Sequence, residues 1–305
     1  MLVRMIRRMR TLGAVCALTL LPFAVVPAAS AHTAPYCTST ANPKIARRLS
    51  TDLRVALRGR SSAISFALYD RKRKLSCFHA SARHYDSAST VKVIIVAALL
   101  RMAQKRGLTA GERALARAAI TRSDNGAASA LWSRVGRSRV QRLLDQIGMR
   151  STRPGPGGYW GLTQITAYDQ LKLLKMLTTH GKILTDRSRA YLLGLMKDVT
   201  PGQRWGTPAG APRGIHVHVK NGWLPRSTHR WRVHSLGTFN GKGHDYMFAV
   251  LTQDDPSMSY GVTSVERLAR AVHHDLNLEL DARLRDPGPS TADEVSDGSA
   301  PYSGL

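Results

Sequence analysis

The stretch from Ser89 to Leu100 reads STVKVIIVAALL, and it gives the strongest indication of the fold. Ser89 and Lys92 are three residues apart, so on a helix they face the same side. A serine at an accessible helix start lies at the positive end of the helix dipole, which favours an attacking oxygen and its anionic intermediate. The residues that follow are apolar on every side, which predicts a buried helix. Lys92 is then a cation at the edge of a core, where it is costly unless paired, or neutral and catalytic.

Two further motifs follow in a fixed order. Ser123-Asp124-Asn125 comes after AITR at 119–122, and Lys220-Asn221-Gly222 comes after the alternating run IHVHV at 215–219. An S-x-x-K alone occurs by chance about once in 300 residues, whereas S-D-N is expected in about one chain of this length in twenty. The order of the three motifs is therefore more informative than any one of them.

With these motifs the chain resembles class A β-lactamases and penicillin-binding proteins, whose signature is S-x-x-K, S-D-N and K-T-G. The resemblance extends from about Pro43 to Asn277. It implies an α+β fold of the β-lactamase/transpeptidase type. A five-stranded antiparallel sheet would be flanked by the N- and C-terminal helices, with an inserted all-helical lobe and a cleft between the lobes.

The pattern of apolar residues independently predicts strands toward both ends of the chain and helices in the middle. Helices are predicted over 43–59, between 89 and 147, near 166–179 and 185–197, and over 262–276, and strands over 64–78 as a hairpin, 215–220, 232–239 and 246–252. This order also favours one sheet with an inserted helical lobe.

The resemblance implies an acyl-enzyme mechanism. Ser89 is the candidate nucleophile, and Lys92 is the candidate base if burial and the nearby charge of Lys220 lower its pKa. Ser123 would pass a proton to the leaving nitrogen. The backbone N–H groups of Ser89 and Trp223 would form the oxyanion hole.

The same resemblance gives candidates for substrate binding. Asn125 would hydrogen-bond the side-chain amide of the substrate, and Lys220 would hold the serine of S-D-N in place. Asn221 stands where the family has a hydroxyl residue, and its amide could still donate to a substrate carboxylate. Arg230 is a candidate partner for that carboxylate, although Arg232 competes for the role.

Two departures from class A enzymes bear on activity. Only 34 residues separate Ser89 from Ser123, which predicts a smaller helical lobe and a cleft that is more open on that side. The loop from Met149 to Thr166 contains no glutamate, although class A enzymes carry one there to activate the deacylating water. Gln164 lies in this loop and is not a base, so the sequence predicts slow deacylation.

The first residues have the pattern of a secretory signal peptide. A basic start precedes an apolar run from Leu12 to Val26, and Ala29-Ser30-Ala31 offers a cleavage site. An uncleaved anchor is the alternative. We predict a signal peptide over 1–31, a β-lactamase-like domain over 32–285, and a disordered tail over 286–305. The predicted location is secreted or extracytoplasmic, in the cell-wall space.

Removal of the signal segment leaves two cysteines, Cys37 and Cys77. Two cysteines in an exported chain favour one disulfide, which would join the entry of the first helix to the second strand. Two free buried thiols are the alternative.

The formal net charge of +25 falls to about +21 without the four arginines of the signal segment. A strongly basic exported protein is attracted to anionic surfaces such as cell-wall polymers or lipid headgroups. No RNA- or DNA-binding motif accompanies the charge, so nucleic acid is not expected as a partner. We expect a monomer without a cofactor. His216 and His218 share a strand face, but without an obvious third ligand a metal site is not predicted.

Three hypotheses for function follow. The first is a serine hydrolase of the class A β-lactamase type, acylated at Ser89 by a β-lactam or a cell-wall peptide amide. The second is a D-alanyl peptidase or esterase of the same superfamily. The third is a non-catalytic cell-wall-binding protein on a degenerate hydrolase scaffold, in which Ser89 is only a helix cap. The intact motif residues favour the two enzymes.

Overall fold

A six-stranded antiparallel sheet forms the centre of the fold. The computed structural model describes residues 34–278 and 299–300, so the predicted signal peptide and most of the predicted tail lie outside the described residues. In the order of the sheet, the strands are β1 (Cys37–Ser39), β3 (Leu75–His79), β2 (Ala63–Asp70), β8 (His244–Asp255), β7 (Trp231–Gly241) and β6 (His216–Pro225).

The predicted α+β class and the antiparallel sheet are confirmed, but the predicted number of five strands is wrong. The additional strand is β1, which has three residues and pairs with β3 so that Cys37 lies opposite Cys77. A segment this short shows no alternation of apolar and polar residues, so its pairing is determined by β3 and not by its own pattern.

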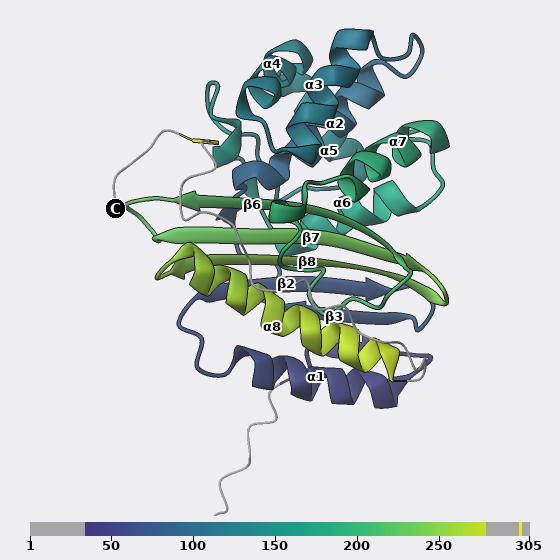
Figure 1. Ribbon diagram of the computed structural model, residues 1–305, viewed down its shortest axis with the longest axis vertical. Helices are drawn as coiled ribbons and strands as arrows, with labels where there is room; N and C mark the ends of the chain where they lie inside the picture. Colours follow the sequence, from purple (N-terminus) through teal and green to yellow (C-terminus); the bar gives the residue numbers. More distant parts are fainter. Residues whose placement is uncertain (1–33, 279–298, 301–305) are drawn as a thin grey trace, which may run out of the picture. The chain divides into compact units, whose positions relative to one another are not determined.

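Two terminal helices cover one face of the sheet, and Figure 1 shows them side by side below it. They are α1 (Pro43–Leu57) and α8 (Met258–Asn277). The helix α1 begins where sequence rules predict, because the Asn42 side chain accepts the Ile45 N–H at 3.2 Å and Pro43 occupies the first turn. Its stripe of Ile45, Leu49 and Leu53 is buried against the sheet.

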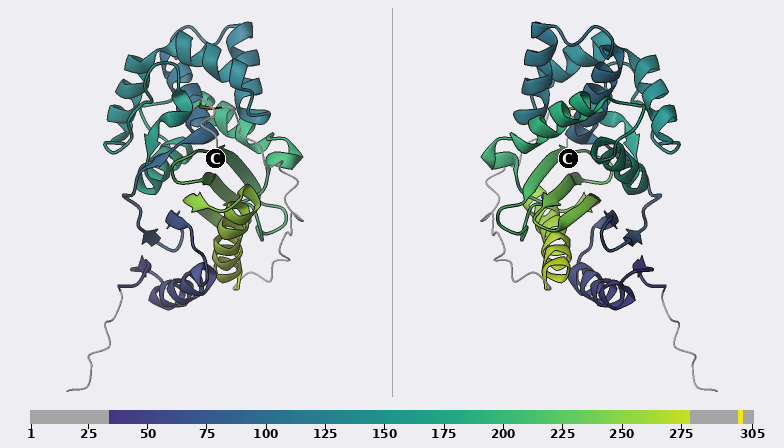
Figure 2. Two further views of the ribbon diagram at one scale, coloured as in Figure 1. Left: turned by 90° about the vertical axis from the view of Figure 1, so that its left-hand side faces the viewer. Right: turned by 90° about the vertical axis from the view of Figure 1, so that its right-hand side faces the viewer.

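The all-helical lobe lies on the other side of the sheet (Figures 1 and 2). Its elements are η1 (Ala88–Thr90), α2 (Val91–Met102), α3 (Ala110–Thr121), α4 (Asn125–Val135), α5 (Arg137–Ile147), α6 (Ala167–Thr178) and α7 (Asp186–Lys197). Every residue of α2 from Val91 to Leu100 is buried, which confirms the predicted buried helix. This helix is the centre around which the lobe packs.

Shorter elements connect the lobe to the sheet. They are the strand pair β4 (Tyr85–Asp86) and β5 (Gln164–Ile165), and the short helices η2 (Trp160–Leu162) and η3 (Pro201–Gln203). The pairing of β4 with β5 brings the 149–166 loop next to the start of α2. None of the helices in the described part of the chain is long and apolar enough to cross a membrane.

The predicted disulfide between Cys37 and Cys77 is present, with Cα atoms 4.0 Å apart and a sequence separation of 40 residues. Closing a loop of this length stabilises a folded protein by about 4 kcal/mol in the chain-entropy model. We expect the Cys37→Ala/Cys77→Ala variant to lose about 2–4 kcal/mol of unfolding free energy, measured by denaturant unfolding. Peptide mapping without reductant should recover the two cysteines as one linked pair, and recovery of both as free thiols would contradict the assignment.

A second prediction concerns Glu112 in the helical lobe, which is 1% exposed. Its carboxylate accepts two hydrogen bonds from Arg106, at 2.7 and 2.8 Å, and one from the Thr109 N–H at 2.9 Å. These contacts, Arg106 first, lower the pKa of Glu112 from 4.5 to about 2. As the pH falls, Glu112 is therefore protonated in the unfolded chain before it is protonated in the folded one. Its contribution to the stability of the fold is complete above about pH 4.5 and is lost as the pH falls toward 2.

We expect Glu112→Gln to reduce the unfolding free energy at pH 7 by about 1–2 kcal/mol, because its arginine partners are half exposed and screened by water. Between pH 4.5 and 2, the unfolding free energy of the variant should also decrease less than that of the wild type. The measurement is urea unfolding across this pH range. The exposed Asp198, whose arginine contact is 3.8 Å long, gives the control variant Asp198→Asn. Parallel pH profiles for the wild type and Glu112→Gln would contradict the prediction.

Candidate active site

Ser89 lies in η1, directly before the buried helix α2. The preceding residue, Ala88, has φ +46°, a conformation that costs a non-glycine residue about 1–3 kcal/mol and is concentrated at functional sites. Ser89 itself has no exposed surface, so the expectation of an accessible helix start is wrong. The reason is the packing on both sides of η1, where Gly222 of β6 approaches one side and the Ser87 N–H donates to Thr163 O of the neighbouring loop at 2.8 Å.

Lys92 is 1% exposed, and its ammonium group is surrounded by neutral oxygens. Its Nζ donates to Ser123 O at 2.5 Å, to Ser123 Oγ at 3.0 Å and to Asn125 Oδ1 at 2.7 Å. The structure thus brings together the first two motifs, although they are separated by all of α3. Lys92 is held by its hydrogen bonds in a defined position on the same helical turn as Ser89.

The hydroxyl of Ser123 also contacts the third motif. Lys220 Nζ donates to Ser123 Oγ at 2.9 Å and to Asn221 O at 2.8 Å, and Lys220 is completely buried. A hydroxyl oxygen has two lone pairs, and the two lysines occupy both. The Ser123 hydroxyl proton must therefore point to a different acceptor, which suits a group that delivers a proton. Ser123 has φ +56°, a second strained residue in this site.

The other two residues of S-D-N have separate roles. Asp124 is the N-cap of α4, and its Oδ1 accepts the Ala127 N–H at 2.6 Å. Asn125 opens α4 and receives Lys92 on its amide oxygen. That hydrogen bond uses the amide oxygen, so the NH₂ group is the end of the Asn125 amide that could donate to a substrate carbonyl.

Gly222 of β6 lies close to the backbone of η1 at the start of the helical lobe. A Cβ atom at this position would lie 2.7 Å from the Ser89 nitrogen and 2.8 Å from the Thr90 nitrogen, both of which are backbone atoms that cannot move aside easily. Glycine is therefore required here. The neighbouring residue Trp223 is 8% exposed, and its ring lies 5.8 Å from that of Trp205.

Asn221 is not part of the lysine–serine group, which consists of Lys92, Ser123 and Lys220. Successive residues of a strand point to opposite faces, so Asn221 points away from the side chain of Lys220. Its Nδ2 donates to Gln203 O at 3.0 Å and to Trp205 O at 2.9 Å, and the residue is completely buried. In the structure this side chain fixes the 203–205 segment.

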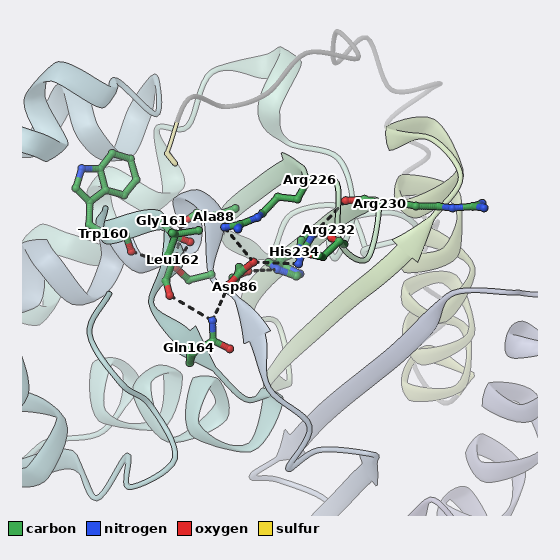
Figure 3. A network of polar contacts seen from close by, with 12 residues as sticks. Asp86, Ala88, Trp160, Gly161, Leu162, Gln164, Arg226, Arg230, Arg232 and His234 are labelled. Atoms are coloured by element: carbon green, nitrogen blue, oxygen red, sulfur yellow. Dashed lines mark hydrogen bonds and ion pairs between the residues drawn. The ribbon is translucent and has the colours of Figure 1, made fainter. Parts of the chain in front are cut away.

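A carboxylate that the sequence did not single out, Asp86, lies three residues before Ser89 and organises one wall of the site (Figure 3). Its Oδ2 lies 3.0 Å from Arg232 and 3.7 Å from Arg226, and its Oδ1 accepts from Gln164 Nε2 at 2.6 Å. Its backbone carbonyl contacts His234 Nε2 at 2.8 Å. Two guanidinium groups on one carboxylate leave this wall with an excess of positive charge.

Burial lowers the pKa of His234 to about 4, so this imidazole is neutral at neutral pH and adds nothing to that charge. The predicted partner for a substrate carboxylate, Arg230, lies in the exposed turn after β6, and Figure 3 shows its side chain extending away from Asp86. The competing Arg232 is 3% exposed and is held by Asp86. Arg226, which the sequence analysis did not select, is the half-buried arginine of this wall.

The 149–166 loop closes the side of the site next to Lys92. Trp160 is 2% exposed, its ring centroid lies 4.9 Å from Lys92 Nζ, and its Nε1 donates to Ser129 Oγ at 3.1 Å. The ring is therefore part of the wall of the site. Gln164 is fixed by Asp86 and by Leu162 O, so it too has a structural role.

The histidine pair on β6 is not part of the lysine–serine group. His218 Nδ1 contacts Thr238 Oγ1 at 2.9 Å, and burial lowers its pKa to about 4. Among the described residues, the group that could hold a metal ion is Asp52, His274 and Asp275, on the terminal helices. Arg48 already donates to Asp275 Oδ1 at 3.1 Å, so this carboxylate has a cationic partner.

Residues 107–276 match the model of the beta-lactamase enzyme family, so the match covers the second and third motifs and begins after Lys92. The chain is 28% identical over 200 residues to LppW, a lipoprotein by its name, of Mycobacterium tuberculosis and Mycobacterium bovis. The matched region spans 62% of the chain and 62% of those relatives.

Solved structures with a similar fold include several β-lactamases. The TLA-3 extended-spectrum β-lactamase superposes with a TM-score of 0.68 at 16% identity, over 75% of this chain and 98% of that one. A β-lactamase from Sphaerobacter thermophilus gives 0.65 at 20% identity, over 76% and 97%. One from Xanthomonas campestris gives 0.63 at 19%, over 76% and 98%. At these identities the likeness establishes the fold alone.

Proposed function

This chain belongs to the beta-lactamase enzyme family, and from that premise we propose that it is an exported serine hydrolase acylated at Ser89. Its acyl donor would be a β-lactam or a cell-wall peptide amide, and deacylation would be slow. The observation that carries the proposal is the position of the Ser123 hydroxyl, which accepts hydrogen bonds from both Lys92 and Lys220. A degenerate scaffold would not need to keep two buried lysines on one hydroxyl.

In the acylation step, Ser89 Oγ attacks the carbonyl carbon and gives up its proton. Lys92, in its neutral amine form, is the proposed acceptor of this proton. Ser123 then donates its hydroxyl proton to the leaving nitrogen as the C–N bond breaks, and it is reprotonated from Lys92. The net result is a Ser89 ester and an amine, which departs when the substrate is a peptide amide and stays attached to the acyl group when it is a β-lactam.

The charge that develops on the carbonyl oxygen would be stabilised by the backbone N–H groups of Ser89 and Trp223. The close approach of Gly222 to the backbone of Ser89 supports this proposal, because it brings the two chain segments together. Asn125 would donate to the amide of the substrate side chain. A carboxylate on the substrate would be attracted by the excess charge of Arg226 and Arg232 around Asp86.

A D-alanyl peptidase or esterase of the same superfamily is the second candidate. It is favoured by the 149–166 loop, which contains no glutamate and presents the buried ring of Trp160 to Lys92. An enzyme that acylates but deacylates slowly resembles a penicillin-binding protein more closely than an efficient β-lactamase. The lipoprotein name of the mycobacterial relatives supports an extracytoplasmic location for this chain as well.

The proposal is tested by incubating the protein with a fluorescent penicillin and measuring the intact mass over time. We expect a single covalent addition, located by peptide mapping on the peptide that contains Ser89. No addition with any β-lactam or with a fluorophosphonate would remove the hydrolase proposal and leave the wall-binding hypothesis.

A third prediction follows for Lys92. The substitution Lys92→Met keeps most of the side-chain volume and removes the base, so acylation should slow by about 10²–10⁴-fold, the usual contribution of a positioned acid–base group. The rate is measured by stopped-flow or quenched labelling, with thermal unfolding as a check that the variant folds. A decrease of less than about tenfold would exclude Lys92 as the main proton acceptor.

A further inference from the structure

A groove of about 410 Å³ lies on the helical lobe and shares no residue with the candidate active site. It is bounded by the end of α5, by α6, and by the loop that leads into α7, which can be followed in Figure 1. Its volume is within the range of about 300–1,000 Å³ that is usual for small-molecule sites. The function proposed above gives this groove no role.

The floor of the groove is apolar. It is formed by Ile147, Met176, Ile183 and Leu184, of which the first three are partly buried and pack on the core of the lobe, while Leu184 is 1% exposed. These side chains offer van der Waals contact to an apolar body but no hydrogen bond. A ligand made only of charged groups would therefore leave the floor unused.

The residues that line the groove include four cations and no aspartate or glutamate. Two of the cations are already paired, because Lys172 contacts Asp169 at 2.9 Å and Arg189 forms an ion pair with Asp186. The other two, Lys175 and Lys182, form no ion pair within the described part of the chain. The groove thus has two positive charges that are not compensated by its own carboxylates.

Lys175 is the more enclosed of these two lysines. Its Nζ lies 3.7 Å from the centroid of the Tyr69 ring, and burial together with the neighbouring Arg71 lowers its pKa. A cation that has lost water and lies close to another cation is stabilised by an anion more than a fully solvated lysine is. Lys182 lies in the exposed loop and lines the same groove.

We propose that this groove binds a small amphipathic anion, specifically a medium-chain fatty carboxylate. Its acyl chain would cover the apolar floor of Met176, Ile183 and their neighbours. Its carboxylate would lie between Lys175 and Lys182. The two chemical features occur together in the groove, and a simple anion or a neutral apolar molecule would satisfy only one of them.

The test is calorimetric titration of the folded full chain with decanoate below its micelle concentration. We expect saturable binding of one molecule per chain. Lys175→Met should weaken the affinity by about tenfold or more, as expected for loss of one charge-assisted hydrogen bond, and Lys182→Met should weaken it in the same direction. The matched control is Lys44→Met, an exposed lysine on α1, which should leave the affinity unchanged.

Three results would overturn the proposal. Equal affinity for acetate would show that the apolar floor contributes nothing, and equal affinity for decyltrimethylammonium would show that the charge contributes nothing. Unchanged binding of decanoate in the Lys175→Met/Lys182→Met variant would place the ligand elsewhere. Because Lys182 is exposed, the Lys182→Met variant should fold normally. It therefore keeps the test valid if the Lys175→Met variant fails to fold.

Discussion

The variant Ser89→Ala is expected to lose all covalent labelling by β-lactams and fluorophosphonates. Lys92 and Lys220 both donate to the Ser123 hydroxyl, so these three groups should keep their positions in the variant. Thr90, and not Ser89, is the N-cap of α2, so the substitution should cost less than the typical ~1 kcal/mol of a lost cap. The measurement is intact-mass analysis after prolonged incubation, with thermal unfolding as the check on folding.

A matched control separates loss of the nucleophile from general damage to the site. Thr90→Ala changes a buried hydroxyl one residue away, whose proton goes to Ser87 O at 2.7 Å, and it should retain labelling. Labelling that persists in Ser89→Ala would mean that a different residue is the nucleophile. Ser123, which lies beside both lysines, would then be the first alternative to examine.

The second large effect concerns the lifetime of the acyl-enzyme. Hydrolysis of the ester needs a base that activates water, and a positioned base contributes about 10²–10⁴-fold in rate. The loop that would supply this base has no glutamate, its Gln164 is fixed by Asp86, and its Trp160 is turned toward Lys92. We therefore expect a stoichiometric burst of β-lactam ring opening, followed by an adduct on Ser89 that persists.

The lifetime is measured by removing excess β-lactam and following the mass of the adduct with time. Gln164→Glu is an informative variant, because it restores a carboxylate to the loop. It should not restore fast turnover, since the new carboxylate would be held about where the Gln164 amide now donates to Asp86 at 2.6 Å, and two carboxylates there repel each other. Steady turnover above roughly 10 s⁻¹ by the wild type, with no trapped adduct, would refute slow deacylation and point to a base elsewhere in the fold.

The parts of the fold that the sequence predicted well are those with strong local patterns. The all-apolar run after Lys92 predicted the buried α2, and the apolar pattern over 43–59 predicted the helix α1. The meeting of Lys92, Ser123 and Lys220 was predicted through the resemblance, because the order of the motifs carries long-range information that periodicity does not. The disulfide followed from the number of cysteines and is confirmed.

The parts that could not be predicted depend on geometry beyond the local sequence. The turn from 226 to 230 between β6 and β7, with a bulge near Trp231, places Arg226 on the Asp86 wall and turns Arg230 outward. The partners of the Asn221 amide, the carbonyls of Gln203 and Trp205, follow from how the 203–205 segment packs against β6. The short strand β1 and the role of Asp86 have no pattern of their own, because each is determined by a partner far away in the sequence.

The Ser123 hydroxyl contacts a lysine from each lobe, so the proposed acylation depends on how rigidly the two lobes are held together. Lys92 reaches it from α2 in the helical lobe, and Lys220 reaches it from β6 at the edge of the sheet. A sliding of the two lobes by about 1 Å would lengthen one of these contacts, and misplacements of that size are enough to reduce a rate by about 10²-fold. Under the proposed mechanism, a compound that separates the two lobes from a distant site would prevent acylation while Ser89 stays chemically intact. Amide hydrogen exchange at residues 123–125 would rise first and would report the separation.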